Sequence, residues 1–256
     1  MIKNSLYIGD CLDVMTAIPD KSIDFILCDP PFQITNAKWD IMIPFDKMWE
    51  QYERIIKDNG CIAIFAAFPF DKMLACSNLK LFKYEWIWEK NQATGFLNAK
   101  KQPMRAHENI LIFYKKQPIY NAQKTLGHKP INSYTKKASV QNRTELYGKV
   151  SLDISGGGET DRYPRSVLKF PSDKQKNKLN GTIHPTQKPL KLCEYLIATY
   201  TNEDDLVLDN AAGSGTTGLA AKNLNRDYIM IEKDPKWVDV VKLRIDDIIL
   251  VSNQKG

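Results

Sequence analysis

Apolar positions in the first part of the chain follow two different periods. Residues 22–29 and 60–68 are short apolar runs rich in Ile, Phe and Ala, which predicts buried strands. In residues 43–57 the apolar positions recur every three or four places, which predicts a helix between those strands. This alternation indicates an α/β fold. Two further strands are expected around a polar, Gly-containing loop, as in an antiparallel pair at a sheet edge: residues 84–90 and 108–116.

The end of the chain returns to the same alternation. Too little chain follows Asp209 to complete a parallel sheet, so strands from residues 1–116 must complete it. We therefore expect a circularly permuted, doubly wound Rossmann-like sheet, mostly parallel with an antiparallel edge, in which residues 1–116 and 183–256 form one domain. Strands are expected at 205–209 and 226–232, and helices at 189–200, 213–224 (after a Gly-rich turn) and 235–251, the last with Pro235 in its first turn.

The segment between these parts, residues 117–182, differs from them in composition and charge. Lys, Asn, Gln, Ser and Tyr dominate it, and apolar periodicity fades. Between Lys115 and Thr182 there are 14 Lys and Arg against five Asp and Glu, whereas the whole chain has a net charge of +6. A charge run alone is usually a solvated face, but excess positive charge confined to one segment suits a region that attracts phosphates. We expect a small basic module here.

Composition excludes several classes of protein. With 43% hydrophobic and 26% charged residues, the chain is expected to fold, which argues against disordered and fibrous classes. No apolar run is long enough to cross a bilayer, and the first residues lack the apolar core of a secretory signal, so a cytoplasmic location without a membrane partner is expected. The five cysteines are scattered and the three histidines lack i, i+4 spacing, so we expect neither disulfides nor a bound metal.

Two strand ends carry candidate chemistry. Residues 208–218 contain G-x-G-x-x-G between a strand and a helix, where glycines let the backbone approach a ligand and helix-terminal N–H groups suit an anion. Glu232 ends the next strand, where a carboxylate can accept hydrogen bonds from ribose hydroxyls. The glycines alone fit a plain tight turn equally well, but with Glu232 they favour a cofactor containing adenosine. NAD and S-adenosylmethionine both remain open at this point.

The segment Asp29, Pro30, Pro31 and Phe32 follows another strand end. Two prolines stiffen the backbone and donate no hydrogen bonds, so the carbonyl groups here are rigid acceptors. Asp29 adds a carboxylate acceptor and Phe32 an aromatic face. Such a set suits a planar base that bears an amino group. A Pro-stiffened strand exit with a surface aromatic is the alternative interpretation.

Together, three segments resemble the permuted β group of the amino-methyltransferases of bacterial and phage DNA modification. Asp29–Phe32 matches their D/N/S-P-P-Y/F tetrapeptide, residues 184–189 (HPTQKP) a second motif, and residues 209–217 the cofactor loop. The resemblance covers nearly the whole chain outside 117–182, although Asn210-Ala211 stands where a Pro-Phe pair is usual. It implies a catalytic half, a target-recognition region and a cofactor-binding half: residues 1–116, 117–182 and 183–256.

The resemblance also implies the roles of single residues. Asp29 and the Pro30 carbonyl would accept hydrogen bonds from the exocyclic amine of a flipped adenine in double-stranded DNA, with Phe32 stacked on the base. The resemblance also implies direct transfer from S-adenosylmethionine without a covalent intermediate, which fits the expectation that Cys28 points the other way along its strand. The implied catalytic residues are Asp29, Pro30, Pro31 and Phe32. The implied cofactor-binding residues are Asp10, Cys11, Asp29, His184, Lys188, Asp209, Gly213, Ser214, Gly215, Thr216, Thr217 and Glu232.

Within that cofactor set, the resemblance puts Asp10 at the adenine amine, Glu232 at the ribose, and Asp209 and residues 213–217 around the methionine portion. His184 and Lys188 would reach the methionine carboxylate. Without the family, Asp10 is as easily a turn or cap residue, and Lys188 a solvated lysine in a helix-leading turn.

Other functions remain open at this stage. Cytosine is the rival target, although the family then more often has Ser before the two prolines, so Asp29 favours adenine. An NAD-dependent oxidoreductase would explain only the glycine loop and Glu232, and a non-enzymatic DNA-binding protein only the basic module. A homodimer and a cognate restriction endonuclease are open as partners. Candidate base or phosphate contacts in the module are Arg143, Arg162 and Arg165.

Overall fold

The computed structural model describes residues 1–33, 40–131, 134–137, 153–172, 176–177, 181–182 and 187–252. The chain divides into two compact units, which are considered separately below. The large unit comprises Met1–Asn121 and Ser166–Gly256, and the small unit is Ala122–Arg165. The interval expected to form a module, 117–182, is therefore broader than the small unit.

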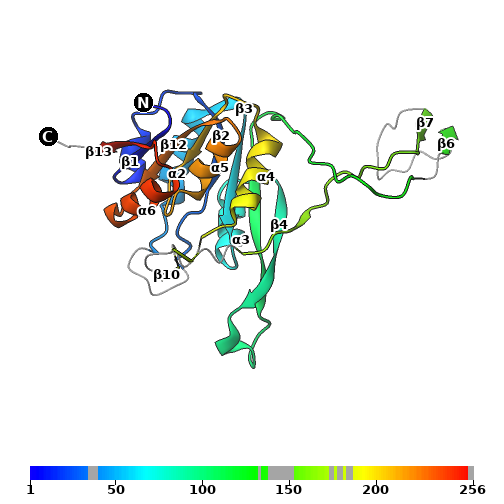
Figure 1. Cartoon of the computed structure of the whole chain (residues 1–256), viewed down its shortest axis with the longest axis horizontal. Coiled ribbons are helices and arrows are strands. Elements are labelled where there is room, and N and C mark those ends of the chain that lie inside the picture. The colour runs from blue at the N-terminus through cyan, green and yellow to red at the C-terminus, as the bar shows by residue number, and fades with distance from the viewer. Residues whose placement is uncertain are drawn as a thin grey trace. The chain divides into compact units, whose positions relative to one another are not determined.

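A nine-stranded sheet forms the centre of the large unit (Figure 1). Its strands are β1 (Ser5–Ile8), β2 (Ile23–Cys28), β3 (Ile56–Ala66), β4 (Phe82–Thr94), β5 (Arg105–Phe113), β8 (Val167–Lys169), β11 (Leu206–Asp209), β12 (Asp227–Glu232) and β13 (Ile249–Ser252). The order is β13-β1-β12-β11-β2-β3-β5-β4-β8, and β5 runs antiparallel to both of its neighbours. The mostly parallel sheet with an antiparallel pair is confirmed.

The permuted arrangement is confirmed by the register of the central strands. Leu208 of β11 lies opposite Ile229 of β12 on one side and opposite Ile26 of β2 on the other, with all three strands parallel. Chain segments from the two ends of the sequence thus form the middle of one sheet. The Gly-rich loop after β11 and the tetrapeptide after β2 consequently emerge side by side at the same sheet edge.

Six α-helices of the described residues cover the two faces of the sheet. Buried residues of α4, α5 and α6 share one apolar cluster, and those of α1, α2 and α3 share the other. These helices are α1 (Cys11–Met15), α2 (Phe45–Ile55), α3 (Phe70–Ser77), α4 (Leu190–Tyr200), α5 (Thr216–Asn223) and α6 (Val238–Arg244). Within the part of the chain that the structure describes, no helix is long and apolar enough to cross a membrane.

The helix expected over 235–251 is wrong in its second half. A short 3-10 helix, η3 (Pro235–Trp237), leads into α6, which ends at Arg244. Asp246 and Asp247 then pair with Lys222, and the β-branched run that follows becomes β13, parallel to β1. A buried apolar run fits a helix or a strand equally well by periodicity, and here the open edge of β1 decides in favour of the strand.

Strand β8 also departs from expectation. It belongs by sequence to the interval 117–182, yet it adds in parallel to β4 and extends the sheet beyond the antiparallel pair, with Trp88 opposite Leu168. Leu168 is buried against the sheet. Two further short strands, β9 (Lys176–Asn177) and β10 (Gly181–Thr182), pair with each other.

The small unit contains a hairpin of β6 (Tyr134–Lys137) and β7 (Asp153–Gly156). Thr125 and Arg162 form an isolated bridge through two backbone hydrogen bonds of 3.0 and 2.9 Å. The guanidinium of Arg162 donates to the carbonyls of Glu159, Asp161 and Lys129. Arg162 therefore ties this unit together, while Arg143 lies outside the described residues.

Candidate active site

A cavity of about 980 Å³ opens at the carboxyl ends of β1, β2, β11 and β12. In doubly wound sheets ligands bind at this edge, where successive connections leave for opposite faces. The expected site residues that line the cavity are Asp10, Cys11, Asp29, Pro30, Pro31, Phe32, Lys188, Asp209, Gly213, Ser214, Thr216, Thr217 and Glu232. His184 lies outside the described residues. Gly215 does not line the cavity and is the N-cap of α5 at the end of the loop.

Backbone geometry explains the glycines of the loop between β11 and α5. Gly215 is the N-cap of α5 with φ of 75°, a left-handed conformation that favours glycine. A Cβ on Gly218 would lie 2.5 Å from the sulfur of Met230, so a larger residue at this position of α5 would have to displace the buried Met230 side chain of β12. The loop is also held by its own amides, because Ala212 N–H donates to the Ile231 carbonyl of β12 and Gly215 N–H to the Ala212 carbonyl.

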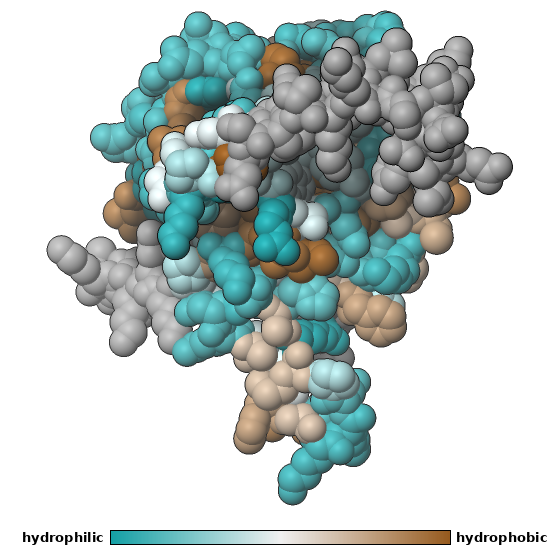
Figure 2. Space-filling model, turned by 90° about the vertical axis from the view of Figure 1, so that its right-hand side faces the viewer, coloured by the Kyte–Doolittle hydropathy of each residue, from teal (hydrophilic) through white to brown (hydrophobic). Residues whose placement is uncertain are grey.

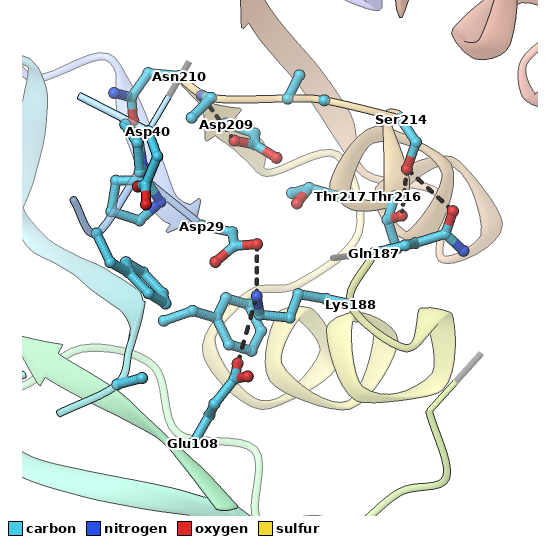
Figure 3. Close-up of a pocket in the computed structure, with 18 of the residues that line it drawn as sticks. Asp29, Asp40, Glu108, Gln187, Lys188, Asp209, Asn210, Ser214, Thr216 and Thr217 are labelled. Carbon is cyan, nitrogen blue, oxygen red and sulfur yellow. Dashed lines mark hydrogen bonds and ion pairs between the residues drawn. The ribbon is translucent and has the colours of Figure 1, made fainter. Parts of the chain in front are cut away.

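A polar cluster anchors the same loop to two distant segments. The Ser214 hydroxyl donates to Gln187 at 3.1 Å (Figure 3). The Arg244 guanidinium donates to the Ser214 carbonyl at 2.7 Å and to the Thr216 hydroxyl at 2.9 Å. Gln187 belongs to the HPTQKP segment, so its hydrogen bond with Ser214 brings that segment to the loop. Sequence reasoning did not identify Arg244, whose signal would have been a basic residue in the last turn of a helix beside the glycine loop.

Backbone N–H groups orient the carboxylates of Glu232 and Asp209, which lie on the side of the cavity formed by the glycine loop, called the cofactor side below. Glu232 accepts hydrogen bonds from the amides of Gly213 at 2.7 Å and Asp234 at 2.8 Å. Asp209 accepts one from the amide of Ala211 at 3.0 Å. Burial raises the pKa of Asp209 to about 7, and burial likewise raises the pKa of Glu232, although its backbone donors oppose this. Both groups have lone pairs left for a ligand.

Asp10 combines a structural role with its place in the cavity. One oxygen caps α1 by accepting from the amide of Leu12 at 3.0 Å, and the other pairs with Lys233 at 2.9 Å. Cys11 follows it as the first residue of α1, and burial raises the pKa of its thiol. The cap interpretation of Asp10 therefore holds, and the cap also fixes Asp10 at the cavity wall.

The catalytic candidate Asp29 is held by a lysine rather than by backbone amides. Lys188 is 8% exposed, and its ammonium lies 2.6 Å from Asp29 Oδ2 (Figure 3). Burial acts to lower the pKa of Lys188, but Asp29 and Glu108 together raise it above its ordinary value. Burial raises the pKa of Asp29, opposed chiefly by Lys188. Lys188 was expected at the methionine carboxylate, so its position on Asp29 and Glu108 is a new feature.

Glu108 extends this pair into a chain of alternating charges. Its carboxylate lies 3.4 Å from Lys188 and 2.5 Å from Lys90. Burial acts to raise the pKa of Glu108, but the two lysines hold it below its ordinary value. The order Asp29, Lys188, Glu108, Lys90 therefore places an ammonium next to each carboxylate in a largely enclosed site. Sequence reasoning missed Glu108, which lies within β5 just before the buried residues of that strand.

Phe32 lies at the rim of the cavity with its ring plane fixed by a neighbour. Its ring stacks on Phe70 with centroids 5.0 Å apart and planes at 22°, and the ammonium of Lys188 lies 5.7 Å from its centroid. Asp40, which is buried, accepts from the amide of Gln33 at 2.7 Å and so anchors the backbone just after the tetrapeptide. Cys28 packs in the apolar cluster of α1, α2 and α3, away from the cavity, as expected.

Two buried amide groups in the cavity wall lack part of their hydrogen bonding. The side-chain nitrogens of Asn210 and Gln187 have no hydrogen-bond partner among the described residues, although the Asn210 oxygen accepts from the Tyr52 hydroxyl at 2.5 Å. Buried donors without acceptors are unfavourable, so a ligand with acceptor oxygens fits here. Across the described ranges no group of three His, Cys, Asp or Glu side chains is arranged to hold a metal ion.

Comparison with known proteins agrees with this geometry. A model of the DNA methylase family N6_N4_Mtase matches residues 23–243. The chain is similar to the Type II methyltransferase M1.MboII of Moraxella bovis, with 30% identity over 257 residues that cover 92% of this chain and 94% of that protein. Type II methyltransferase M2.MboI of the same organism is 28% identical over 270 residues, which cover 95% of this chain and 88% of that protein.

Solved structures extend the likeness to three dimensions. The M1.HpyAVI–SAM complex aligns with a TM-score of 0.62 at 26% identity, covering 94% of this chain and 98% of that one. The cytosine-N4-specific PvuII DNA methyltransferase aligns with a TM-score of 0.69 at 18% identity, which establishes the shared fold. The chain therefore belongs to the N6/N4 family of S-adenosylmethionine-dependent DNA methyltransferases.

Proposed function

We propose that this protein transfers a methyl group from S-adenosylmethionine to the exocyclic amine of a flipped adenine in duplex DNA. One observation carries the proposal: a single cavity is lined both by the glycine loop with Glu232 and by Asp29-Pro30-Pro31-Phe32. The cofactor supplies an electrophilic methyl on a sulfonium. What remains for the protein is to bind both partners, orient the amine and stabilise the charge that develops on it.

The residues of the cofactor side fit S-adenosylmethionine group by group. Glu232 keeps lone pairs for ribose hydroxyls, while Asp209 suits the ammonium of the methionine portion and the N-terminus of α5 at the end of the loop suits its carboxylate. The unpartnered amide nitrogen of Gln187 supplies a donor for the same carboxylate. Lys188 is committed to Asp29, so we assign the carboxylate contacts to the loop and to Gln187 instead.

On the catalytic side, Asp29 and the Pro30 carbonyl accept the two N–H groups of the target amine, while Phe32 stacks on the base. Conjugation with the ring makes such an amine a poor nucleophile, and hydrogen bonds from both N–H groups favour a pyramidal nitrogen with an available lone pair. Lys188, which also pairs with Glu108, favours the ionised form of Asp29 and so opposes the rise that burial gives its pKa, and an ionised carboxylate is a hydrogen-bond acceptor. As positive charge develops on nitrogen, the Asp29 carboxylate stabilises it.

Adenine is preferred over cytosine because Asp rather than Ser precedes the two prolines. Mass spectrometry of nucleosides from DNA of cells that express the chain tests this directly, and sequencing of the methylated positions gives the recognition site. We expect N6-methyladenine, absent from cells that express Asp29→Ala. N4-methylcytosine would replace the adenine proposal by its cytosine alternative, and an unmodified genome would contradict both. Membership of the family leaves no support for an NAD-dependent or a non-enzymatic reading.

The small unit and its basic surroundings are proposed to recognise the target sequence. If their lysines and arginines neutralise phosphates, the logarithm of DNA affinity should fall linearly with that of salt concentration, with a slope that reports the number of contacts. Replacing Lys136, Lys137 and Arg165 by Ala should reduce that slope by about one for each lost contact. Arg162 is left intact because it holds the unit together. An unchanged slope would assign DNA binding elsewhere.

The Type II relatives support a role in a restriction-modification pair, and we propose double-stranded DNA and a cognate endonuclease as partners. A homodimer is also proposed, following the β group. Sedimentation of the purified protein measures its oligomeric state directly, and a monomer at micromolar concentration would contradict the proposed homodimer.

A further inference from the structure

The β4–β5 hairpin carries exposed apolar side chains at its tip. Phe96 is 77% exposed and Leu97 is 97% exposed, side by side on the short 3-10 helix η1 (Phe96–Asn98). Figure 1 shows the hairpin extending from the sheet beyond the helices, and Figure 2 shows apolar and hydrophilic surface next to each other on this projection. Large adjacent apolar groups on a protruding tip mark a surface that contacts another molecule.

The tip has an ordered backbone. Gly95 adopts a left-handed conformation with φ of 89°, and the amides of Asn98, Ala99 and Lys101 donate to the carbonyls of Gly95, Phe96 and Asn98. Such a turn presents its side chains in a fixed direction, so little conformational entropy is lost when they are buried by a partner.

Charge identifies the partner. Residues 91–107 contain Lys100, Lys101 and Arg105 and no Asp or Glu. An apolar tip flanked by positive charge alone suits a polyanion whose interior is apolar and stacked, which describes a nucleic acid duplex.

Position relates the tip to the reaction. Gln92, Ala93 and Thr94 on β4, together with Arg105 and His107 on β5, line the same cavity as Asp29. The base of the hairpin is therefore part of the wall of the active site, and its tip projects from that wall. A duplex whose target base enters the cavity must pass close to this tip.

We propose that the β4–β5 hairpin binds the duplex and that Phe96 and Leu97 insert into the base stack, filling the space that the flipped target base leaves. The inference rests on the proposed methylation of a base in duplex DNA. Flipping costs the stacking and pairing of the target nucleotide, and an apolar wedge offsets part of that cost. Lys100, Lys101 and Arg105 contact the phosphates on either side.

The experiment compares two substrates that differ in the cost of flipping. Duplexes that contain the mapped recognition site carry the target base either correctly paired or opposite an abasic position, which removes its pairing. The double variant Phe96→Ser with Leu97→Ser is expected to lower kcat/KM on the paired duplex by roughly tenfold or more, and on the abasic duplex by less than about threefold. Cofactor affinity, measured by calorimetry, should not change.

Leu79→Ser is the matched control. Leu79 is 68% exposed and precedes the opposite end of β4, so its replacement tests the general loss of an exposed apolar group, and both duplexes should be methylated at the parent rate. Equal loss on the two duplexes, or no loss on either, would overturn the wedge. A wedge variant that lowers the sedimentation coefficient would overturn it too, because the tip would then be a contact between protein chains. A parent protein that methylates no duplex would instead contradict the proposed function.

Discussion

The two sides of the cavity hold their carboxylates by different means. On the cofactor side, Glu232 and Asp209 are fixed by backbone N–H donors that belong to the loop and the following turn. On the catalytic side, Asp29 is fixed by the ammonium of Lys188, itself held by Glu108. Backbone donors cannot leave without unfolding the loop, whereas an ammonium at a carboxylate can yield its place to an incoming amine.

This difference suggests a division of labour. The cofactor site is preorganised by the fold, because its acceptors keep their orientation with or without ligand. The Asp29 carboxylate is oriented by the ammonium of Lys188, which also favours its charged form. This ammonium resembles the target amine of the base, because both donate hydrogen bonds from nitrogen.

The largest effect is expected at Asp29. Asp29→Ala should lower the single-turnover rate of methyl transfer by about 10³, because the acceptor that stabilises charge on the amine is lost. Cofactor affinity should stay within about twofold of the parent, since Asp29 is not held by the glycine loop. Rapid-quench assays with labelled cofactor measure the first quantity, and calorimetry the second.

Two further variants keep the Asp29 test interpretable. Replacing Asp29 by Ala leaves the buried Lys188 with Glu108 as its one remaining anionic partner. Asp29→Asn, which keeps the side-chain volume, is therefore measured alongside Asp29→Ala. Phe32→Tyr retains the stacking face and should remain active. A near-parent rate for Asp29→Ala would refute the catalytic role even with the family assignment intact.

A smaller effect is expected at Glu232 on the cofactor side. Glu232→Ala should weaken S-adenosylmethionine binding by roughly 10- to 100-fold, because it removes a ribose acceptor and frees the amides of Gly213 and Asp234 that it orients. Glu232→Gln keeps one acceptor oxygen, so its affinity for S-adenosylmethionine should lie between those of Glu232→Ala and the parent. Calorimetric affinity for Glu232→Ala equal to that of the parent would remove this residue from the cofactor site.

Glu108 tests whether the charge chain sets the ionisation of Asp29. The negative charge of Glu108 contributes to raising the pKa of Asp29, so Glu108→Gln should lower it. If ionised Asp29 is the active form, the acidic limb of the kcat profile moves to lower pH. Lys188 then has a single anionic partner and holds Asp29 more tightly, so kcat should also fall by about threefold.

Glu89→Gln is the control for Glu108. Glu89 lies on β4 and pairs with Lys169 at 3.2 Å in an exposed position, away from the cavity lining. Its replacement should leave the pH profile unchanged. An acidic limb that stays in place, or moves upward, in Glu108→Gln would show that Glu108 acts on stability alone.

How far the sequence predicted this site depended on where each residue lies relative to a strand end. Asp29, Asp209 and Glu232 were predicted because each follows or ends an apolar run, and strand order then brings such ends together. Glu108 and Lys90 were missed because their meeting with Lys188 requires β5 to lie between β3 and β4, which no local pattern encodes. Long-range ion pairs of this kind depend on sheet order rather than on motif.

The fold shows the same limit in two places. The central strands and the helices α2, α4 and α5 were predicted from periodicity, whereas α1 and α3 were not, and residues 249–251 were assigned to a helix because short apolar runs fit both periods. Arg162 was proposed as a nucleic acid contact from composition, whereas its guanidinium donates to three carbonyls. Composition gives the charge of a segment, and only the backbone around a residue decides whether that charge is available to a ligand.

The smallest predicted effect concerns the proton on Asp209. Because burial raises the pKa of Asp209 to about 7, this carboxyl is largely protonated in the free enzyme at pH 6.5. An ammonium of the cofactor beside it favours the ionised form, so binding should release about half a proton or more at that pH, and progressively less above pH 7. Calorimetry in buffers of different ionisation enthalpy measures the release, and Asp209→Asn should abolish it.

Stability gives a second measure of the same group. In the folded protein the pKa of Asp209 lies above its ordinary value of 3.8. The stabilisation that protonated Asp209 gives to the folded state is therefore fully present below pH 3.8 and is lost as pH rises through about 7. Asp209→Asn cannot ionise, so its melting temperature relative to the parent should increase between pH 6 and pH 8 in the absence of cofactor. A difference independent of pH would show that Asp209 is already ionised before the cofactor binds, and both carboxylates of the cofactor side would then be preorganised as anions.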